Sequence, residues 1–250
     1  MTAHIVCTTQ EGVLEICFNR PDKKNAITDE MYAAIIKAMN AAKDDERVGA
    51  VLFTAVGDYF SAGNDLADFL AVSQHGGDMQ GWAFVQLLAD YPKPIIAAVT
   101  GAGVGIGMTL LLHCDLVYIH KDARLSVPFV NLALVPEAAS SLLLTARIGY
   151  AKAFEMFALG ESMTGEMATS CGLANACFDD MDEVQMVARQ KAQLIANKPA
   201  QSVLLTKSLM RDSSRIIACM KQEKAYFSEC LAGAEARAIF ERFFNKQAKP

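Results

Sequence analysis

Short apolar runs alternate with longer amphipathic stretches between residues 13 and 178 of the chain. Most of these runs are rich in β-branched residues and are too short for a helix, which is typical of buried strands. The predicted strands are Val13–Phe18, Ala50–Val56, Ile95–Val99, Leu116–Ile119 and Leu173–Phe178. Because helical stretches separate most of them, the pattern predicts crossover units and an α/β fold.

Helices are predicted near the N-terminal end and throughout the last quarter of the chain. Residues 28–42 have helical apolar spacing, with Thr28 as a possible cap and two acidic residues in the first turn. The predicted helices of the tail are Asp182–Ala196, Ala200–Met210, Ile216–Cys230 and Glu235–Phe244. With no repeat or long linker, we expect one body: residues 1–181 as the core and 182–250 as a helical lid or assembly region.

The segment from Pro94 to Cys114 carries no formal charge and is long enough to span a membrane. Its glycines even form overlapping G-x-x-x-G pairs. However, Ile95–Val99 is typical of a buried strand, and four alternating glycines after it would break a continuous helix. Since no second span, basic flank or signal peptide accompanies the segment, a strand, a glycine turn and a short helix explain it better.

The glycine turn at residues 101–107 could in principle bind a dinucleotide. Its spacing is G-x-G-x-G-x-G, so Ile106 stands where the third glycine of a dinucleotide-binding turn should lie. That turn also usually opens a domain, whereas this one follows about a hundred residues of other structure. A close-packed glycine turn at a helix start has free N–H groups, so an anion cradle is the third interpretation.

Composition narrows the class of protein. The chain has 250 residues, is 52% hydrophobic and carries a net charge of −5 without a Lys/Arg-rich tract, which argues against nucleic-acid binding. Its seven cysteines include no C-x-x-C pair and lie mostly in apolar runs. We therefore expect reduced thiols in a cytoplasmic protein, with no disulfide frame and no zinc site. The dispersed His4, His75 and His120 form no metal-binding spacing.

A turn with small residues follows the second predicted strand, in the sequence FSAGNDL at Phe60–Leu66. Without side-chain bulk, the N–H groups of Ala62 and Gly63 could approach a ligand. The alternative is an ordinary strand-to-helix turn in which Asn64 or Asp65 caps the helix. The turn by itself favours the second interpretation.

Glu137 is the only charged residue between Arg124 and Arg147, and it follows Pro136 at an expected helix start. It could be a first-turn carboxylate that interacts favourably with the helix dipole. It could also be a general base, because apolar surroundings raise the pKa of a carboxyl group toward neutrality. The residues alone leave both possibilities open.

Other candidate groups have structural explanations. Ser140 and Ser141 are weak nucleophile candidates, because the chain has no G-x-S-x-G turn. We expect His113 to be a core or helix-terminal histidine. Asp115 is expected to close the helix and cap a neighbouring element.

In order and content, these segments resemble the enoyl-CoA hydratase/isomerase (crotonase) superfamily. The motifs that carry the resemblance are Asn19–Ile27, Phe60–Leu66, Lys93–Gly107 (KPIIAAVTGAGVGIG), His113–Asp115 and Val135–Ser141 (VPEAASS). The resemblance covers nearly the whole chain. It implies a crotonase-like spiral of ββα crossover units with a C-terminal helical region that mediates trimers or hexamers. It also implies an acyl-CoA substrate that brings its own coenzyme A, with no separate cofactor and no metal.

The resemblance further implies a set of site residues. The N–H groups of Ala62 and Ile106 would hold the thioester oxygen as an enolate forms, and Glu137 would be the catalytic acid/base. Loop Ala71–Gln80 would border the acyl pocket. The residues expected to contact acyl-CoA are Lys23, Ala26, Ala62, Gly63, Asn64, Asp65, Leu66, Gly105 and Ile106.

Two departures from the hydratase pattern change the expected reaction. Where hydratases of the superfamily carry two glutamates, this chain has Thr109 and Phe129, which cannot activate water as a carboxylate does. Glu137 lies where the 3-enoyl-CoA to 2-enoyl-CoA isomerases carry their single acid. One carboxylate suffices for that reaction, because it can move one proton from the alpha to the gamma carbon. We expect such an isomerase; an enoyl-CoA hydratase or a non-catalytic acyl-CoA-binding module are the alternatives.

Overall fold

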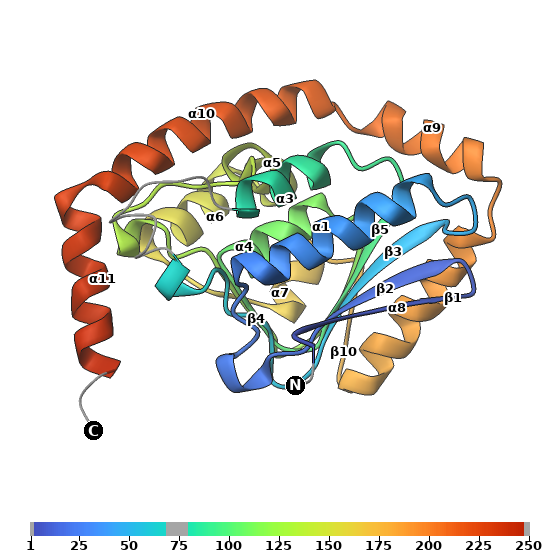
Figure 1. Cartoon of the computed structure of the whole chain (residues 1–250), viewed down its shortest axis with the longest axis horizontal. Coiled ribbons are helices and arrows are strands. Elements are labelled where there is room, and N and C mark those ends of the chain that lie inside the picture. Colours follow the sequence, from blue (N-terminus) through green and yellow to red (C-terminus); the bar gives the residue numbers. More distant parts are fainter. Residues whose placement is uncertain (1–2, 69–79, 248–250) are drawn as a thin grey trace.

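Two β-sheets form the frame of the protein in a computed structural model that describes residues 3–68 and 80–247 (Figure 1). The six-stranded sheet has the order β1 (Ile5–Gln10), β2 (Val13–Phe18), β3 (Ala50–Ala55), β5 (Ile95–Val99), β7 (Leu116–His120) and β10 (Ala176–Phe178). The four-stranded sheet has the order β4 (Tyr59–Ser61), β6 (Ala102–Val104), β8 (Arg124–Ser126) and β9 (Met163–Thr164).

Successive turns of the chain add one strand to each sheet and then form a helix. Strand β3 is followed by β4, β5 by β6 and β7 by β8, and these successive turns pair in parallel in both sheets. This is the expected spiral of ββα units. The helices are α1 (Asp29–Asp44), α3 (Gln80–Ala89), α4 (Ile106–Thr109), α5 (Ser140–Ile148), α6 (Tyr150–Phe154), α7 (Gly165–Ser170), α8 (Met181–Ala196), α9 (Ala200–Met210), α10 (Ser213–Ala232) and α11 (Ala234–Gln247).

The local sequence pattern predicts the central strands better than the peripheral ones. Four predicted strands are confirmed with bounds that differ by at most one residue, but the fifth is reduced to Ala176–Phe178. Strand β1 was not predicted, because it lies at the sheet edge and exposes every residue except Ile5. The strands of the four-stranded sheet have only two or three residues, which is too short for a periodic signal.

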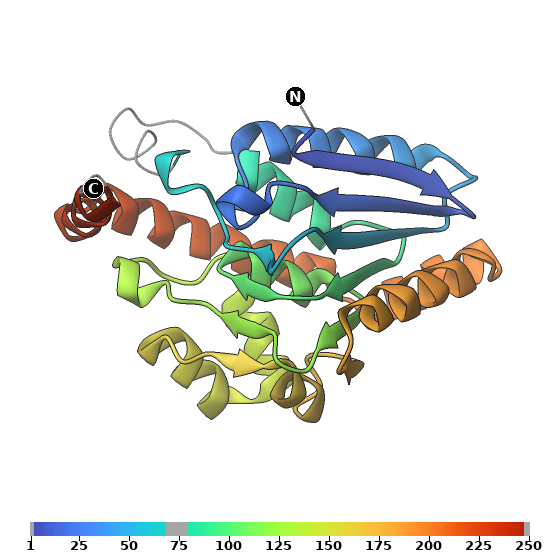
Figure 2. The same cartoon turned by 90° about the horizontal axis from the view of Figure 1, so that it is seen from below.

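Helices cover both faces of the six-stranded sheet. Along β3, Val51 and Phe53 join the main core with α1 and α3, whereas Leu52 packs with Val184 and Ala188 of α8. Figure 2 shows the same arrangement from below. Because α8 buries one face of this sheet, the packing of the core continues beyond the domain boundary predicted between residues 181 and 182.

The predicted helices of the tail are confirmed, and α10 runs along the outside of the molecule past α5 and α3 (Figure 1). Helix α9 exposes Leu209 by 89% and Met210 by 83%. An assembly would cover such apolar side chains, but the predicted trimer or hexamer stays a prediction. Among residues 3–68 and 80–247, no helix has the length and apolar character needed to cross a membrane.

Candidate active site

The glycine turn joins β6 to α4, as the sequence predicted. Gly105 has φ 55° and ψ −122°, a conformation that glycine adopts readily, and its N–H donates to the carbonyl of Ser126 at 3.0 Å. Helix α4 begins at Ile106, so the N–H of Ile106 lies in the first turn, where no preceding carbonyl is available. Within the described ranges, this N–H has no hydrogen-bond acceptor.

The turn after β4 corrects one predicted oxyanion donor. The N–H of Ala62 donates to the carbonyl of Lys24 at 2.9 Å, and the N–H of Gly63 donates to Ser61 Oγ at 3.1 Å. Neither group is available to a ligand. The N–H of Asn64 has no acceptor among the residues that the structure describes, so Asn64, and not Ala62, presents the available amide.

The two turns touch backbone to backbone. A Cβ atom added to Gly63, whose φ is 92°, would lie 2.8 Å from the carbonyl oxygen of Val104. One added to Gly107 would lie 2.5 Å from the carbonyl oxygen of Ser61. Only glycine permits this approach, which brings the turn that carries Asn64 against the turn that carries Ile106.

Asn64, Ile106 and Glu137 line one small cavity, together with Tyr32, Gly81, Trp82 and Phe227. The hydroxyl of Tyr32 donates to Asn64 Oδ1 at 2.6 Å, which orients the side-chain amide of Asn64. Burial raises the pKa of Tyr32 well above its ordinary value, so its hydroxyl keeps its proton. Trp82 and Phe227 meet edge to face, with ring centroids 5.5 Å apart. Sequence reasoning missed these aromatic residues, because α1, α3 and α10 bring them together from distant positions.

Glu137 is 7% exposed, and the hydroxyl of Thr109 donates to its Oε1 at 2.6 Å. Burial raises the pKa of Glu137 to about 8, with a smaller contribution from the charge of Glu223, while the Thr109 hydrogen bond opposes the rise. The expected helix start at Glu137 is wrong: α5 begins at Ser140. Glu137 therefore lies in the turn before the helix, where it faces the cavity.

The structure brings most of the predicted acyl-CoA contacts together at one place. The segment through Ala26 lies beside the turn after β4, because the N–H of Ile27 donates to the carbonyl of Gly63 at 2.8 Å. Lys23 is exposed on a 3₁₀ helix. Two predicted contacts have other partners: Asp65 forms an ion pair with Arg20 at 2.7 Å, and Leu66 packs against the core. Of the predicted acyl-pocket loop Ala71–Gln80, only Gln80 is among the described residues.

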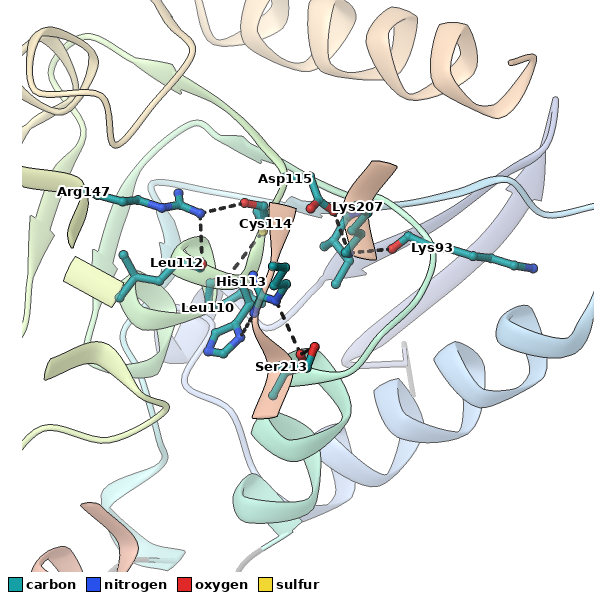
Figure 3. Close-up of polar contacts among 12 residues, drawn as sticks. Lys93, Leu110, Leu112, His113, Cys114, Asp115, Arg147, Lys207 and Ser213 are labelled. Atoms are coloured by element: carbon teal, nitrogen blue, oxygen red, sulfur yellow. Dashed lines mark hydrogen bonds and ion pairs between the residues drawn. The ribbon is translucent and has the colours of Figure 1, made fainter. Parts of the chain in front are cut away.

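His113 and Asp115 have the structural roles that the sequence predicted. His113 is fully buried at the end of the 3₁₀ helix Leu110–His113. Asp115 accepts the first N–H of β5, from Ile95, and pairs with Lys207 at 2.7 Å (Figure 3). In the described part of the chain, no group of three or more His, Cys, Asp or Glu side chains is placed to hold a metal ion.

The hydroxyl of Ser140 is buried and has no hydrogen-bond partner in the described structure. A buried hydroxyl without a partner costs about 1–3 kcal/mol. We expect Ser140→Ala to raise the free energy of unfolding by about 1 kcal/mol and to keep the wild-type turnover, as measured by urea denaturation and enzyme assay. A large loss of turnover would instead show that this hydroxyl takes part in the reaction.

Comparison with known proteins places this chain in a family. The enoyl-CoA hydratase/isomerase family matches residues 8–250. Enoyl-CoA delta isomerase 2 of Rattus norvegicus is 39% identical over 84% of this chain and 55% of the relative, so the chain spans about half of that protein. Enoyl-CoA delta isomerase 3, peroxisomal, of Mus musculus is 34% identical over 92% of this chain and 73% of the relative.

Solved structures support the same assignment. OdaA of Pseudomonas aeruginosa superposes with a TM-score of 0.92 at 39% identity, over 97% of this chain and 99% of that chain. An enoyl-CoA hydratase/isomerase from Pseudoalteromonas atlantica has a TM-score of 0.92 at 37% identity, over 99% of each chain. The predicted superfamily and its spiral fold are confirmed, and this chain belongs to the enoyl-CoA hydratase/isomerase family.

Proposed function

We propose that this protein is an enoyl-CoA isomerase that moves a double bond from the 3-position to the 2-position of an acyl-CoA thioester. The observation that carries this proposal is the content of one cavity. Among the described residues that line it, Glu137 is the one carboxyl group, and it is accompanied by Asn64 and Ile106, whose main-chain N–H groups have no acceptor in the described structure. Acyl-CoA chemistry through an enolate needs one base and donors for one oxygen.

In the proposed reaction, the thioester oxygen accepts hydrogen bonds from the N–H groups of Asn64 and Ile106. The Glu137 carboxylate removes a proton from the alpha carbon, and the electron pair of that C–H bond forms the enolate. The protonated Glu137 then donates the same proton to the gamma carbon. The electron pair of the 3,4 double bond forms this new C–H bond. The pair between carbons 1 and 2 of the enolate becomes the 2,3 double bond, and a pair on the enolate oxygen re-forms the thioester carbonyl.

The surroundings of Glu137 suit it to both halves of this proton transfer. A pKa of about 8 lies close to physiological pH, so the group can accept a proton and release it again. A positioned acid/base contributes typically about 10²–10⁴-fold in rate. One donor to a developing oxyanion contributes about 2.7–4 kcal/mol.

Hydration is the second candidate reaction, because 2,3-dehydroadipyl-CoA hydratase of Escherichia coli is 30% identical over 98% of this chain. Hydration would need a group that activates water as well as one that protonates carbon. The superfamily's hydratases carry a glutamate at each of two positions, and Thr109 occupies one of these positions here. Its hydroxyl instead donates a hydrogen bond to Glu137 at 2.6 Å. Among the residues described as lining the cavity, Glu137 is the one carboxylate, which favours the isomerase.

A non-catalytic acyl-CoA-binding module is the third possibility. Burial of Glu137 opposes its ionisation, as the raised pKa shows, and simple binding of a thioester does not require this cost. A buried acid beside two main-chain N–H groups that have no acceptor among the described residues therefore favours an enzyme.

Two substrates distinguish these functions. We expect purified protein to convert a 3-enoyl-CoA into the conjugated 2-enoyl-CoA, followed as a rise in the absorbance of the conjugated thioester. With a 2-enoyl-CoA in water, we expect almost no loss of that absorbance. The reverse pattern would identify a hydratase, and unchanged absorbance with both substrates would identify a binding module.

A further inference from the structure

A residue of the C-terminal helices caps the helix that follows Glu137. Helix α5 has Ala139 at its N-cap, and alanine has no side-chain acceptor for the first N–H groups. Glu223, a residue of α10 that is 6% exposed, supplies the missing acceptor. Its carboxylate accepts the N–H of Ala139 at 2.6 Å, and both the N–H and the hydroxyl of Ser141, at 3.0 and 2.6 Å. Three donors on one carboxyl group favour its ionised form, although burial raises the pKa of Glu223.

His113 contacts Ala138, the residue between Glu137 and Ala139. Its Nε2 lies 2.8 Å from the carbonyl oxygen of Ala138, and its Nδ1 lies 2.7 Å from Nη2 of Arg211. Because a guanidinium group can only donate, Nδ1 accepts, and Nε2 carries the proton that is donated to Ala138. Burial, aided by the charge of Arg211, lowers the pKa of His113 to about 3, so the ring is neutral.

Hydrogen bonds from Arg147 and Lys207 hold the backbone around His113. Arg147 donates to the carbonyl oxygens of Leu112 at 3.0 Å and Cys114 at 3.1 Å, on either side of the histidine (Figure 3). Lys207 donates to Asp115 and to the carbonyl oxygen of Lys93. Residues of α5 and α9 thus fix the end of the 3₁₀ helix from which His113 reaches Ala138.

The segment that these two residues hold is strained. Ala138 has φ 58° and Ala139 has φ 55°, so two consecutive non-glycine residues lie in the left-handed region. This conformation is unfavourable for alanine and persists only where the surroundings enforce it. If either contact were lost, the segment could relax, and the adjoining Glu137 would move with it.

We propose that Glu223 and His113 are positioning residues that clamp the segment Glu137–Ala139, so that the C-terminal helices determine where the Glu137 carboxyl group lies. The kinetic consequence rests on the proposed function, whereas the position and titration of Glu137 do not depend on it. The groups that face Glu137 are Tyr32 from α1, Thr109 from α4 and Glu223 from α10. Of these, Glu223 is the group whose charge, when it is ionised, opposes ionisation of Glu137.

The test is a carboxyl titration of the whole protein without ligand. In protein labelled with ¹³C at the glutamate carboxyl group, the Glu137 signal is assigned by its absence from Glu137→Gln. Glu223→Gln keeps the side-chain length but replaces one of the two acceptor oxygens by an NH2 donor and removes the charge. The hold on Ala139 and Ser141 is therefore weakened, and we expect the pKa of Glu137 to fall by about 0.5 or more. An unchanged titration of Glu137 in this variant overturns the proposal.

A matched pair of variants tests the contact from His113. His113→Gln places an amide where Nε2 was and keeps a donor for Ala138, whereas His113→Asn mimics Nδ1 and loses that donor. We expect the Glu137 pKa to fall toward its ordinary value in His113→Asn, because water reaches the displaced carboxyl group, and to stay near the wild-type value in His113→Gln.

Kinetics separate the clamp from the proposed reaction. We expect kcat for a 3-enoyl-CoA to fall about tenfold in His113→Asn, with KM within about twofold and partial rescue in His113→Gln. Equal titration and equal kcat in the two variants would refute the clamp. If wild-type protein converts no enoyl-CoA, the proposed function fails, and the titrations still decide whether Glu223 and His113 position Glu137.

Discussion

Replacement of Glu137 by glutamine should lower the turnover of a 3-enoyl-CoA by about 10²–10⁴-fold, with little change in KM. The amide keeps an oxygen for the hydroxyl of Thr109, which donates to Oε1 at 2.6 Å, but it cannot accept a proton from carbon. The measurement is the initial rate of formation of the conjugated thioester. Glu166→Gln, at an exposed position on α7, is the matched control and should keep the wild-type rate. Retention of most activity in Glu137→Gln would mean that another group is the base.

The pH dependence follows from the same carboxyl group. Burial raises the pKa of Glu137 from 4.5 to about 8, and only its ionised form can remove a proton. Wild-type kcat/KM should therefore rise with pH and level off above pH 8. A profile that is flat from about pH 6 to about pH 9, on both sides of the Glu137 pKa of about 8, would contradict this assignment.

Glu137→Gln should also make the protein more stable at alkaline pH. Between pH 4.5 and about 8 the native state binds more protons than the unfolded chain, so wild-type stability falls as the pH rises through this window. Glutamine carries no charge and escapes this loss. The difference in the free energy of unfolding should be small near pH 5 and should reach the order of 5 kcal/mol above pH 8. Urea denaturation at several pH values measures it, and a difference independent of pH would contradict the raised pKa.

Gly107→Ala should remove much of the oxyanion stabilisation, with a loss of about 10²-fold or more in kcat. The new Cβ at position 107 would lie 2.5 Å from the carbonyl oxygen of Ser61 and 2.9 Å from the Cβ of Ser61. Helix α4 must therefore move away from the turn after β4. This movement separates the N–H of Ile106 from the N–H of Asn64. We expect a loss of about 1–3 kcal/mol in the free energy of unfolding as well, because the contact is overpacked.

Gly172→Ala is the control that separates this geometric effect from simple destabilisation. Gly172 has φ 81°, so alanine is strained there, but a Cβ would meet no atom within 4 Å. We expect Gly172→Ala to lose about 1 kcal/mol of stability and to keep the wild-type kcat. Both variants are assayed for kcat below their melting temperatures, so that each is compared in its folded state. Wild-type kcat in Gly107→Ala would show that the approach of the two turns is not required.

The glycine turn and the candidate acid, Glu137, were accessible from local sequence, whereas the main-chain N–H group that lacks an acceptor in the turn after β4 was not. The pattern of residues 101–107 predicted a turn and a short helix, and α4 begins at Ile106 as this pattern requires. The prediction of Ala62 failed because an N–H is available only if no carbonyl approaches it. The carbonyl that occupies the N–H of Ala62 belongs to Lys24, in a separate segment of the chain.

The sequence by itself determined the central strands, the tail helices, the family and Glu137 as the candidate base. These features depend on apolar periodicity, turn residues and motifs, which are local properties of the chain. Only the tertiary structure decided that the N–H of Asn64 lacks an acceptor in the described part of the chain, that Thr109 donates to Glu137, and that Glu223 caps the helix after Glu137. Each of these depends on which groups the fold brings together, or keeps apart, from remote parts of the chain.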